Sequence, residues 1–269
     1  MNHFPEAWGR PRDDVYGSYD RSVFGHDAAG PTQHTQQPIV TGTSVVALKF
    51  KDGVVIAADN LASYGSLARF NDVERLRQVG THTIVGASGD VSDMQFLYEK
   101  QLENLIIAED YQEDGHGLRA KHIYSYLSRV MYHRRSKMDP LWNVLLVAGW
   151  DDGKPFLASA DLLGTTFSSP ALASGFGAHL AVPLLRRIAP DEASVANITR
   201  EQAIKTIEEC MKVLFYRDAR SMNKYTMAIV TGKEGTNDEP DIEIQKDVSL
   251  KQQSWKFAEK IRGYGAQTV

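Results

Sequence analysis

The sequence has little of what disulfides, metal sites and membrane spans require. It contains a single cysteine, Cys210, so no disulfide can form within the chain. The eight histidines show no ligand-like spacing with Cys210 or with one another, so we expect no metal site and no cofactor. No stretch approaches the roughly 18 unbroken apolar residues of a membrane helix, and the run at 143–148 is typical of a buried strand.

An excess of positive charge is also missing. The 30 Lys and Arg residues face 34 Asp and Glu residues, which gives a net charge of -4. Because nucleic-acid-binding surfaces normally need a basic stripe, we expect no nucleic-acid partner and no membrane partner. The hydrophobic content of 42% and charged content of 24% are typical of a soluble globular protein with a sizeable core.

Residues 1–34 differ from the rest of the chain. They are rich in Gly, Pro, Asp and His and show neither helical nor strand periodicity. They contain no apolar h-region, which argues against a secretory signal. A disordered leader and a removable pro-segment both fit this composition.

From residue 39 onward, the hydrophobic pattern predicts alternating groups of strands and helices. Strands are predicted at 43–50, 54–58, 81–87, 143–150, 155–160, 165–168, 225–231 and 241–245. Helices are predicted around 94–106, 120–135, 180–188 and 199–214. Gly89 is expected to break the third strand, Asp90 to cap the first helix, and Thr199 with Gln202 to form a capping box.

The order of these elements predicts an α+β fold. Adjacent strands joined by tight turns indicate antiparallel sheets, and paired helices indicate outer layers. Two face-to-face sheets covered by helix pairs would bury every apolar face, which is a four-layer αββα sandwich. No domain break is apparent after residue 40.

Four short motifs occur in one order along the chain: GTS at 42–44, GVVIAAD at 53–59, GASGD at 86–90 and YRDARS at 216–221. In this combination, the chain resembles β-type subunits of the proteasome over about residues 35–248. The resemblance implies the N-terminal-nucleophile hydrolase fold, in which active members use a terminal threonine. Further matches to a non-catalytic β-type member are TQQPIVTGT (35–43), YGSLARF (64–70), RRSKM (134–138) and DPLWN (139–143).

The resemblance places the active-site positions of the family on seven residues. Those that keep the expected residue type are Thr43, Asp59, Gly89 (the oxyanion donor), Asp218 and Ser221. Two depart from the family pattern. The catalytic lysine falls on Arg75, which stays protonated and cannot relay a proton. A supporting serine falls on Phe176, which has no hydroxyl.

The chemistry of a threonine nucleophile also depends on where the chain is cut. Its base would be its own α-amine, which exists only if cleavage occurs directly before Thr43. The resemblance instead implies removal of a pro-segment, 1–34, between His34 and Thr35. Residues 35–42 would then remain as an extended strand of about 26 Å, long enough to leave the cleft and reach a neighbour. We therefore expect vestigial positions and no catalytic residue.

Each of these positions also has a plain structural interpretation. Thr43 and Ser44 fit ordinary strand residues, and Asp59 fits a turn at a strand end. Asp218 and Ser221 fit polar groups at the end of a helix, which is the role that we favour.

The segment 251–269 follows the last strand of the predicted domain, 43–250. Phe257, Ile261 and Tyr264 share one helical face, and Trp255 precedes them. The tail either folds back on its own core or docks into another subunit. The resemblance implies the second, with contacts to β-type subunits of the same and the opposite ring, to α-type subunits and to assembly chaperones.

The resemblance further implies a cytoplasmic and nuclear location. The basic cluster 134–137 fits a nuclear-import signal, although a solvated helix end or an interface is the favoured interpretation. Two rival functions remain open. An active N-terminal threonine endopeptidase requires cleavage after Gly42, and an α-type ring subunit predicts an added N-terminal helix that residues 1–34 do not indicate.

Overall fold

The structure is a computed structural model that describes residues 37–112, 117–236 and 238–255. The chain divides into two units, Met1–Gln36 and Gln37–Val269, and every described strand and helix belongs to the second unit. The predicted leader 1–34 and most of the predicted tail lie outside the described residues. In the described ranges, no helix combines the length and apolar character needed to cross a membrane.

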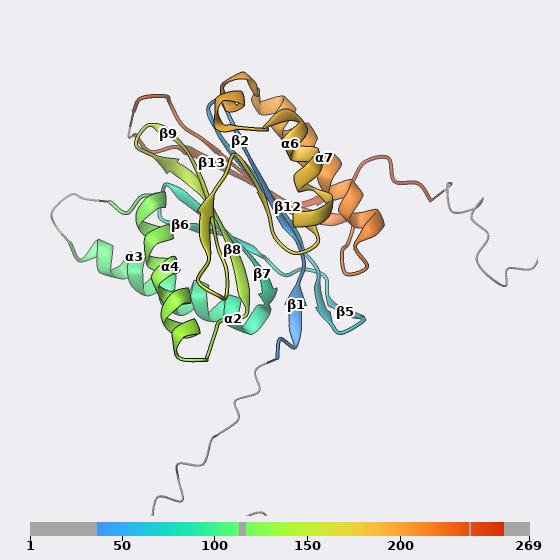
Figure 1. Ribbon diagram of the computed structural model, residues 1–269, viewed down its shortest axis with the longest axis horizontal. Coiled ribbons are helices and arrows are strands. Elements are labelled where there is room, and N and C mark those ends of the chain that lie inside the picture. The colour runs from blue at the N-terminus through green and yellow to red at the C-terminus, as the bar shows by residue number, and fades with distance from the viewer. Residues whose placement is uncertain (1–36, 113–116, 237, 256–269) are drawn as a thin grey trace, which may run out of the picture. The chain divides into compact units, whose positions relative to one another are not determined.

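Strands and helices follow one another in alternating groups (Figure 1). The strands are β1 (Val40–Gly42), β2 (Val45–Phe50), β3 (Gly53–Asp59), β4 (Ala62–Tyr64), β5 (Leu67–Phe70), β6 (Leu76–Val79), β7 (Thr83–Asp90), β8 (Asn143–Asp151), β9 (Lys154–Ala160), β10 (Thr166–Ser168), β11 (Ala171–Ala173), β12 (Lys224–Thr231) and β13 (Asp241–Ser249). The helical segments are α2 (Val91–Phe96), the π-helical η3 (Leu97–Leu102), α3 (Glu103–Asp110), α4 (Ala120–Ser136), α5 (Gly177–Leu180), α6 (Val182–Ile188), the 3-10 segment η4 (Glu192–Asn197) and α7 (Arg200–Arg217).

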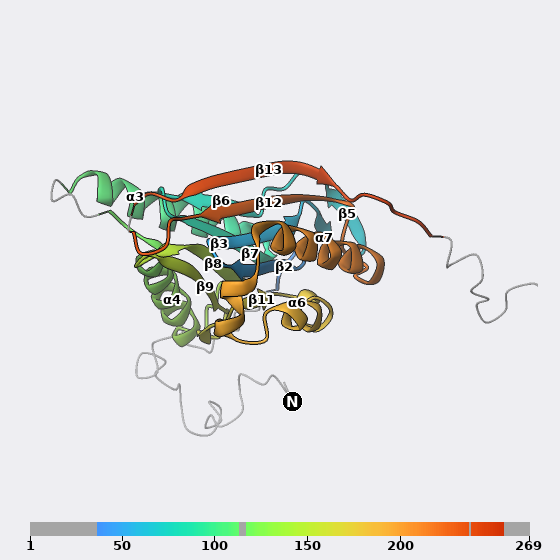
Figure 2. The same ribbon diagram turned by 90° about the horizontal axis from the view of Figure 1, so that it is seen from above.

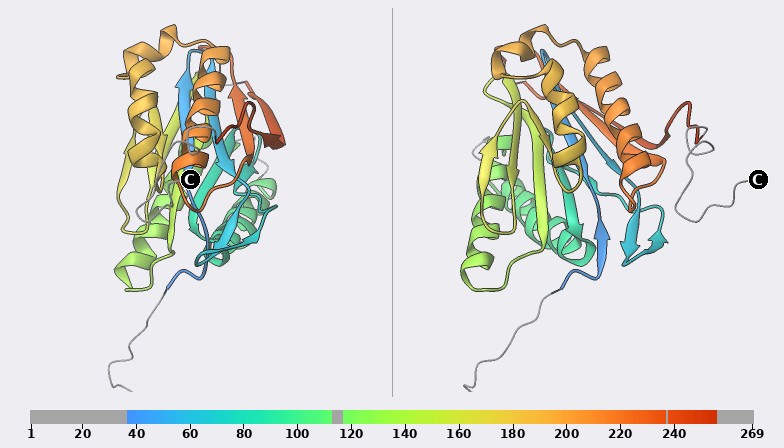
Figure 3. Two further views of the ribbon diagram at one scale, coloured as in Figure 1. Left: turned by 90° about the vertical axis from the view of Figure 1, so that its right-hand side faces the viewer. Right: turned by 45° about the vertical axis from the view of Figure 1, so that its right-hand side comes forward.

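The strands form two antiparallel sheets. The larger sheet runs β10-β9-β8-β7-β1-β4-β5, and β6 also pairs with β7. The smaller sheet runs β11-β2-β3-β12-β13. Figure 3 shows β1 beside β7 and the β4–β5 hairpin, in agreement with the pairing registers. The short strand that precedes Thr43 is therefore an interior member of the larger sheet.

Three hydrophobic cores define the layers. One lies between the two sheets, a second between the smaller sheet and helices α5, α6 and α7, and a third between the larger sheet and helices α2 to α4. Figure 2 shows α6 and α7 packed together, with α4 lying apart from them. This arrangement confirms the predicted αββα sandwich. Cys210 is fully buried in the second core, as expected for a small core residue.

Strand β3 shows why a strand could be predicted from the hydrophobic pattern. Val54 and Ile56 face the core between the sheets, whereas Val55 and Ala57 face the helices. Both faces of the strand are buried, so the sequence is a continuous apolar run instead of an alternating one. The predicted caps at Asp90 and Thr199 are also confirmed, because Asp90 accepts from the Asp93 amide and Thr199 from the Gln202 amide.

Several predicted boundaries were wrong. Gly89 does not break its strand, because β7 continues through Asp90 to pair with β1. Strand β2 begins at Val45 instead of Thr43, because the carbonyl groups of Thr43 and Ser44 accept hydrogen bonds from a side chain, not from a neighbouring strand. The predicted helix over 180–188 divides at Ala181. Strand β1 falls within the extended segment predicted at 35–42, but it pairs with β4 and β7 of its own chain instead of leaving the cleft. Strands β4, β5, β6 and β11 were not predicted; all of them have only three or four residues, too few to show a period.

Candidate functional site

Strand β1 carries the chain directly into Thr43 and is paired on both sides. Thr41 lies opposite Ser63 of β4 and opposite Asp90 of β7, and Gly42 lies opposite Gly89. The amide of Ile39 also donates to Asp90 Oδ1, over 3.0 Å. These contacts hold the residues directly before Thr43 within the larger sheet.

The hydroxyl of Thr43 is bound to a carboxylate. Thr43 Oγ1 donates to Asp218 Oδ2 over 2.5 Å. Asp218 directly follows α7, and its other oxygen, Oδ1, accepts from the amide of Arg220 over 2.9 Å. Both oxygens of this buried carboxylate therefore have a donor. The structure brings Thr43 and Asp218 together, as the family pattern implied.

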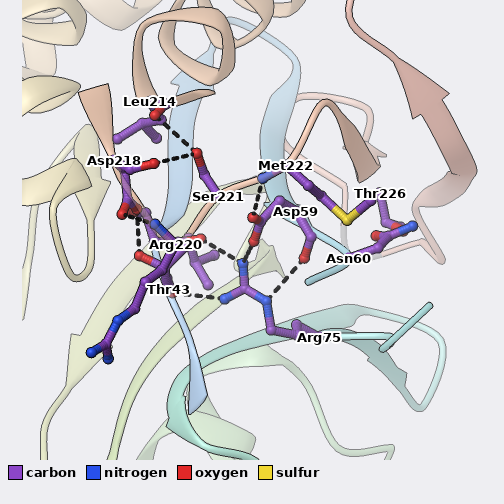
Figure 4. A network of polar contacts seen from close by, with 12 residues as sticks. Thr43, Asp59, Asn60, Arg75, Leu214, Asp218, Arg220, Ser221, Met222 and Thr226 are labelled. Atoms are coloured by element: carbon purple, nitrogen blue, oxygen red, sulfur yellow. Dashed lines mark hydrogen bonds and ion pairs between the residues drawn. The ribbon is translucent and has the colours of Figure 1, made fainter. Parts of the chain in front are cut away.

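Arg75 lies beneath Thr43 with its side chain fully enclosed (Figure 4). Its Nε donates to the carbonyl of Asp59 over 2.9 Å, and Nη1 donates to the carbonyls of Thr43 and Ala87 over 2.7 and 3.3 Å. Its Nη2 donates to the carbonyl of Ser44 over 2.8 Å and to Asp59 Oδ1. A guanidinium has five N–H donors, so these five acceptors satisfy it completely. Arg75 thus joins the two sheets by hydrogen bonds to Asp59 at the end of β3 and Ala87 in β7.

Asp59 is the buried anion that accompanies Arg75. Its Oδ2 accepts from the amide of Met222 over 3.1 Å, so both of its oxygens are bound. Burial raises the pKa of Asp59 from 3.8 to about 6, and the guanidinium of Arg75 opposes that rise. The carboxylate is therefore ionised at pH 7 and forms a buried ion pair with Arg75.

Gly89, the predicted oxyanion donor, is held in an unusual backbone conformation. Its φ is +95°, and a Cβ at this position would lie 2.1 Å from the carbonyl oxygen of Trp142. Only glycine fits there without strain. Because Gly42 faces it across the β1–β7 pairing, the chain's own strand covers this position.

Ser221 and Phe176 are placed differently from the other predicted site residues. The hydroxyl of Ser221 donates to the carbonyls of Leu214 and Asp218, over 3.0 and 2.8 Å, so it closes the end of α7. The structural interpretation of Ser221 as a helix-end group is therefore the one that the contacts support. Phe176 precedes α5 and is 56% exposed, with its ring at a cleft.

A cleft of about 550 Å³ opens beside Thr43. Its walls come from β1, the end of β7, the start of β8, the turn before α5 and the end of α7. The lining residues are Thr41, Gly42, Thr43, Ser88, Gly89, Trp142, Asn143, Val144, Leu162, Gly175, Phe176, Arg217, Asp218, Ala219 and Arg220. Within the described residues, no group of three or more His, Cys, Asp or Glu side chains is arranged to hold a metal ion.

Sequence analysis assigned no site role to two polar residues that position the segments around Thr43. Asn143 donates through Nδ2 to the carbonyls of Ser88 and Asp90, which fixes the end of β7. Ser44 Oγ accepts from the amide of Gly177 over 2.8 Å and so holds the start of α5. For Asn143, the sequence showed a polar residue at the start of an apolar strand. Its hydrogen-bond partners, the carbonyls of Ser88 and Asp90, could not be identified from the sequence.

The predicted interface tail is described only as far as Trp255. This ring packs edge-on against Phe215 and Tyr216 of α7, with centroid distances of 5.8 and 5.0 Å. Trp255 therefore contacts its own chain and is half exposed, which favours the fold-back alternative for this residue. Phe257, Ile261 and Tyr264, like His34 and Thr35 at the predicted cleavage point, lie outside the described residues.

The basic cluster at 134–137 ends α4. Arg134 forms a 3.0 Å ion pair with Asp139 and lies over the ring of Phe96, and Arg135 lies over the ring of Tyr132. These contacts are those of a helix end, one of the interpretations left open by the sequence.

The fold and the residues around Thr43 define a class, the N-terminal-nucleophile hydrolase fold of proteasome subunits. A family model described as proteasome subunit matches residues 39–230. The chain therefore belongs to the proteasome subunit family, and within it to the β-type subunits.

Individual relatives are similar over nearly the whole chain. It is 53% identical to the probable proteasome subunit beta type-7 of Schizosaccharomyces pombe, over 98% of this chain and 97% of that protein. It is 47% identical to proteasome subunit beta type-7 of Saccharomyces cerevisiae, over the full length of both. It is 45% identical to proteasome subunit beta type-4 of Xenopus laevis, over 88% of this chain and 93% of that protein.

Proposed function

We propose that this chain is a non-catalytic, structural subunit of the β-ring of the proteasome core. The observation that carries the proposal is Arg75, whose five bound N–H groups stand where the family pattern places a catalytic lysine. The expected cleavage before Thr35 would also leave Thr43 with an amide nitrogen, because β1 stays attached. A threonine hydroxyl needs a base, and a terminal α-amine with a pKa of about 7.7–8.0 would be suited to that role. An amide nitrogen has no basic lone pair and cannot fill it.

The other groups near Thr43 do not replace the missing base. Arg75 donates all five of its N–H groups and has no site at which to accept a proton. Asp218 accepts from the Thr43 hydroxyl, but a carboxylate is a weak base toward an alcohol, whose proton is far less acidic than that of a carboxylic acid. Losing one acid–base group typically costs about 10²–10⁴ in rate, so two such losses leave little activity.

Strand β1 also occupies the place where an extended peptide would have to bind. It fills the gap between β4 and β7 and pairs with both. A substrate strand could bind these two edges only if β1 left the sheet. While β1 stays attached, it therefore occupies the position between β4 and β7 and also keeps the nitrogen of Thr43 in a peptide bond.

The short contact between Thr43 and Asp218 favours one alternative, an active N-terminal threonine endopeptidase. That function requires cleavage between Gly42 and Thr43 and withdrawal of β1. The two functions differ in the N-terminus of the mature chain. We expect cleavage upstream, between His34 and Thr35, which keeps β1 attached.

The test uses the core particle purified from its native source. The particle is treated with an electrophilic peptide that labels active threonines, and this subunit is then sequenced from its N-terminus and mapped by mass spectrometry. We expect an N-terminus upstream of residue 43 and no label on Thr43, with labelled threonines on other subunits as the positive control. A chain that begins at Thr43 and carries the label would establish the endopeptidase instead.

As a structural subunit, the chain would contact β-type neighbours in its own and the opposite ring, α-type subunits and assembly chaperones, in the cytoplasm and the nucleus. The C-terminal tail is the proposed ring–ring contact. Deletion of 256–269, which keeps Trp255 on α7, should slow the joining of half-assemblies, measured by native gel electrophoresis. Joining at the normal rate would contradict a role for the tail.

A further inference from the structure

The cleft beside Thr43 carries two positive charges that no described side chain neutralises. Arg217 ends α7 and Arg220 follows in the next turn, and both are exposed residues that line the cleft. Neither guanidinium forms an ion pair or hydrogen bond with the described residues. In Figure 4 the side chain of Arg220 points away from Thr43 and Asp218, and no contact reaches its guanidinium.

The carboxylate of the cleft, Asp218, already has hydrogen-bond donors within the chain. Asp218 is buried, and its two oxygens accept from the Thr43 hydroxyl and from the Arg220 amide. Arg75 and Asp59 form a closed pair below the cleft. The charged groups left for a ligand are therefore the two guanidinium groups, whose planar N–H pairs match a carboxylate.

The cleft also has apolar lining residues. Phe176 is 56% exposed and Trp142 is 39% exposed, and Leu162 and Val144 line the space with them. A volume of about 550 Å³ is within the range of small-ligand sites, which combine an apolar lining with a few polar groups that orient the ligand. The cleft thus favours a ligand with an apolar side chain and a carboxylate.

We propose that this cleft binds short peptides non-covalently through a carboxylate held by Arg217 and Arg220, with a neighbouring apolar side chain on Phe176 and Trp142. This inference rests on the proposed function, because a subunit that cannot cut a peptide can hold one that other subunits have produced. Every hydrolysed peptide bond creates a new C-terminal carboxylate, which makes peptide products the ligand class that this chemistry fits.

The experiment uses assembled core particles and a tetrapeptide that ends in a photo-reactive leucine with a free carboxylate. After irradiation, cross-links on this subunit are counted by mass spectrometry. We expect cross-links at the cleft walls, a loss of about tenfold when the C-terminus is amidated, and a similar loss in the variant R217Q/R220Q. An amidated tetrapeptide that ends in Glu shows whether a side-chain carboxylate serves equally well.

A matched control removes the same charge elsewhere. Arg186 and Arg187 are neighbouring exposed arginines on α6 that do not line the cleft, so R186Q/R187Q should cross-link like the wild type. Higher salt should also reduce cross-linking of the free acid more than that of the amide. Equal cross-linking of acid and amide, no cross-links on this subunit, or the same loss in both double variants would overturn the proposal. None of these outcomes affects the N-terminus or labelling of Thr43, which test the proposed function separately.

Discussion

Two groups of side chains lie near Thr43, and they differ in how completely their charges are bound. The inner cluster, formed by Arg75, Asp59 and Asp218, is buried, and every donor of its guanidinium and every oxygen of its carboxylates has a partner. The cleft rim, formed by Phe176, Arg217 and Arg220, is exposed, and its guanidinium groups have no partner among the described residues. The charges of the inner cluster are paired within the chain and hold the fold together. The guanidinium groups of the cleft rim are exposed and can pair with a ligand.

The inner cluster also shows how Arg75 differs from the lysine that the family pattern places at this position. A lysine has three donors and can lose a proton, whereas Arg75 uses five donors to hold four backbone carbonyls and Asp59. The side chain therefore acts as a connection between strands. The position where the family pattern places a catalytic lysine is, in this chain, part of the packing between the sheets.

The largest effect should follow from removing this connection. R75M leaves the carboxylate of Asp59 buried without its cation and four carbonyls without their donor, so we expect a loss of about 3–5 kcal/mol in unfolding free energy. Urea unfolding of the full-length chain measures it. The control is R77A on β6, whose side chain is 48% exposed and paired with Glu103, for which we expect less than about 1 kcal/mol. Equal effects would show that the inner cluster has no special role.

The second-largest loss of stability is expected at Gly89, which lines the cleft. G89A places a Cβ 2.1 Å from the Trp142 carbonyl at a φ of +95°, so strain and overlap together should cost about 3 kcal/mol. The matched variant G65A has a positive φ of +58° but no atom within 4 Å of the added Cβ. It should cost only about 1–2 kcal/mol. Thermal unfolding distinguishes the two, and similar losses would mean that the contact with Trp142 relaxes easily.

The dependence of stability on pH tests the environment of Asp59 in the inner cluster. Because the folded pKa of Asp59 is about 6, above its ordinary 3.8, folded protein binds this proton more tightly than unfolded protein. Its contribution to stability is complete below about pH 4 and is lost as the pH rises through 6, a change of at most about 3 kcal/mol. Compared with D59N, the wild type should therefore lose stability over this interval. Parallel pH profiles for the two proteins would contradict the raised pKa.

The smallest effect on stability should come from the cleft rim. Arg217 and Arg220 form no ion pair in the described part of the chain, so R217Q/R220Q should change the unfolding free energy by less than about 0.5 kcal/mol. The same urea experiment measures it. A loss above about 1 kcal/mol would show that these arginines belong to the fold and weaken their assignment to a ligand.

Much of the architecture could be predicted because the long strands are buried on both faces and therefore apolar throughout, as in β3 and β8. Each cap at Asp90 and Thr199 is a side chain that accepts from the backbone amide three residues later, so the cap residue can be read from the local sequence. Short strands such as β4 and β11 could not be predicted, because three residues show no periodicity. The segment before Thr43 was predicted to be extended, but only the fold decided that β1 pairs with β4 and β7. The leader, the cleavage point and the tail beyond Trp255 stay predictions.

The sequence by itself determined the order of the layers and placed Thr43, Asp59, Arg75 and Asp218 at the positions of the family's site, since local hydrophobicity and motif spacing carry that information. Only the tertiary structure decided what those residues do. Burial makes an unpaired charge costly, so Arg75 and Asp59 must satisfy each other and the surrounding carbonyls. Partners that lie 16 or more residues apart along the chain are set by how the sheets pack, and that packing joins Arg75, Asp59 and Asp218 in one buried set of contacts around Thr43.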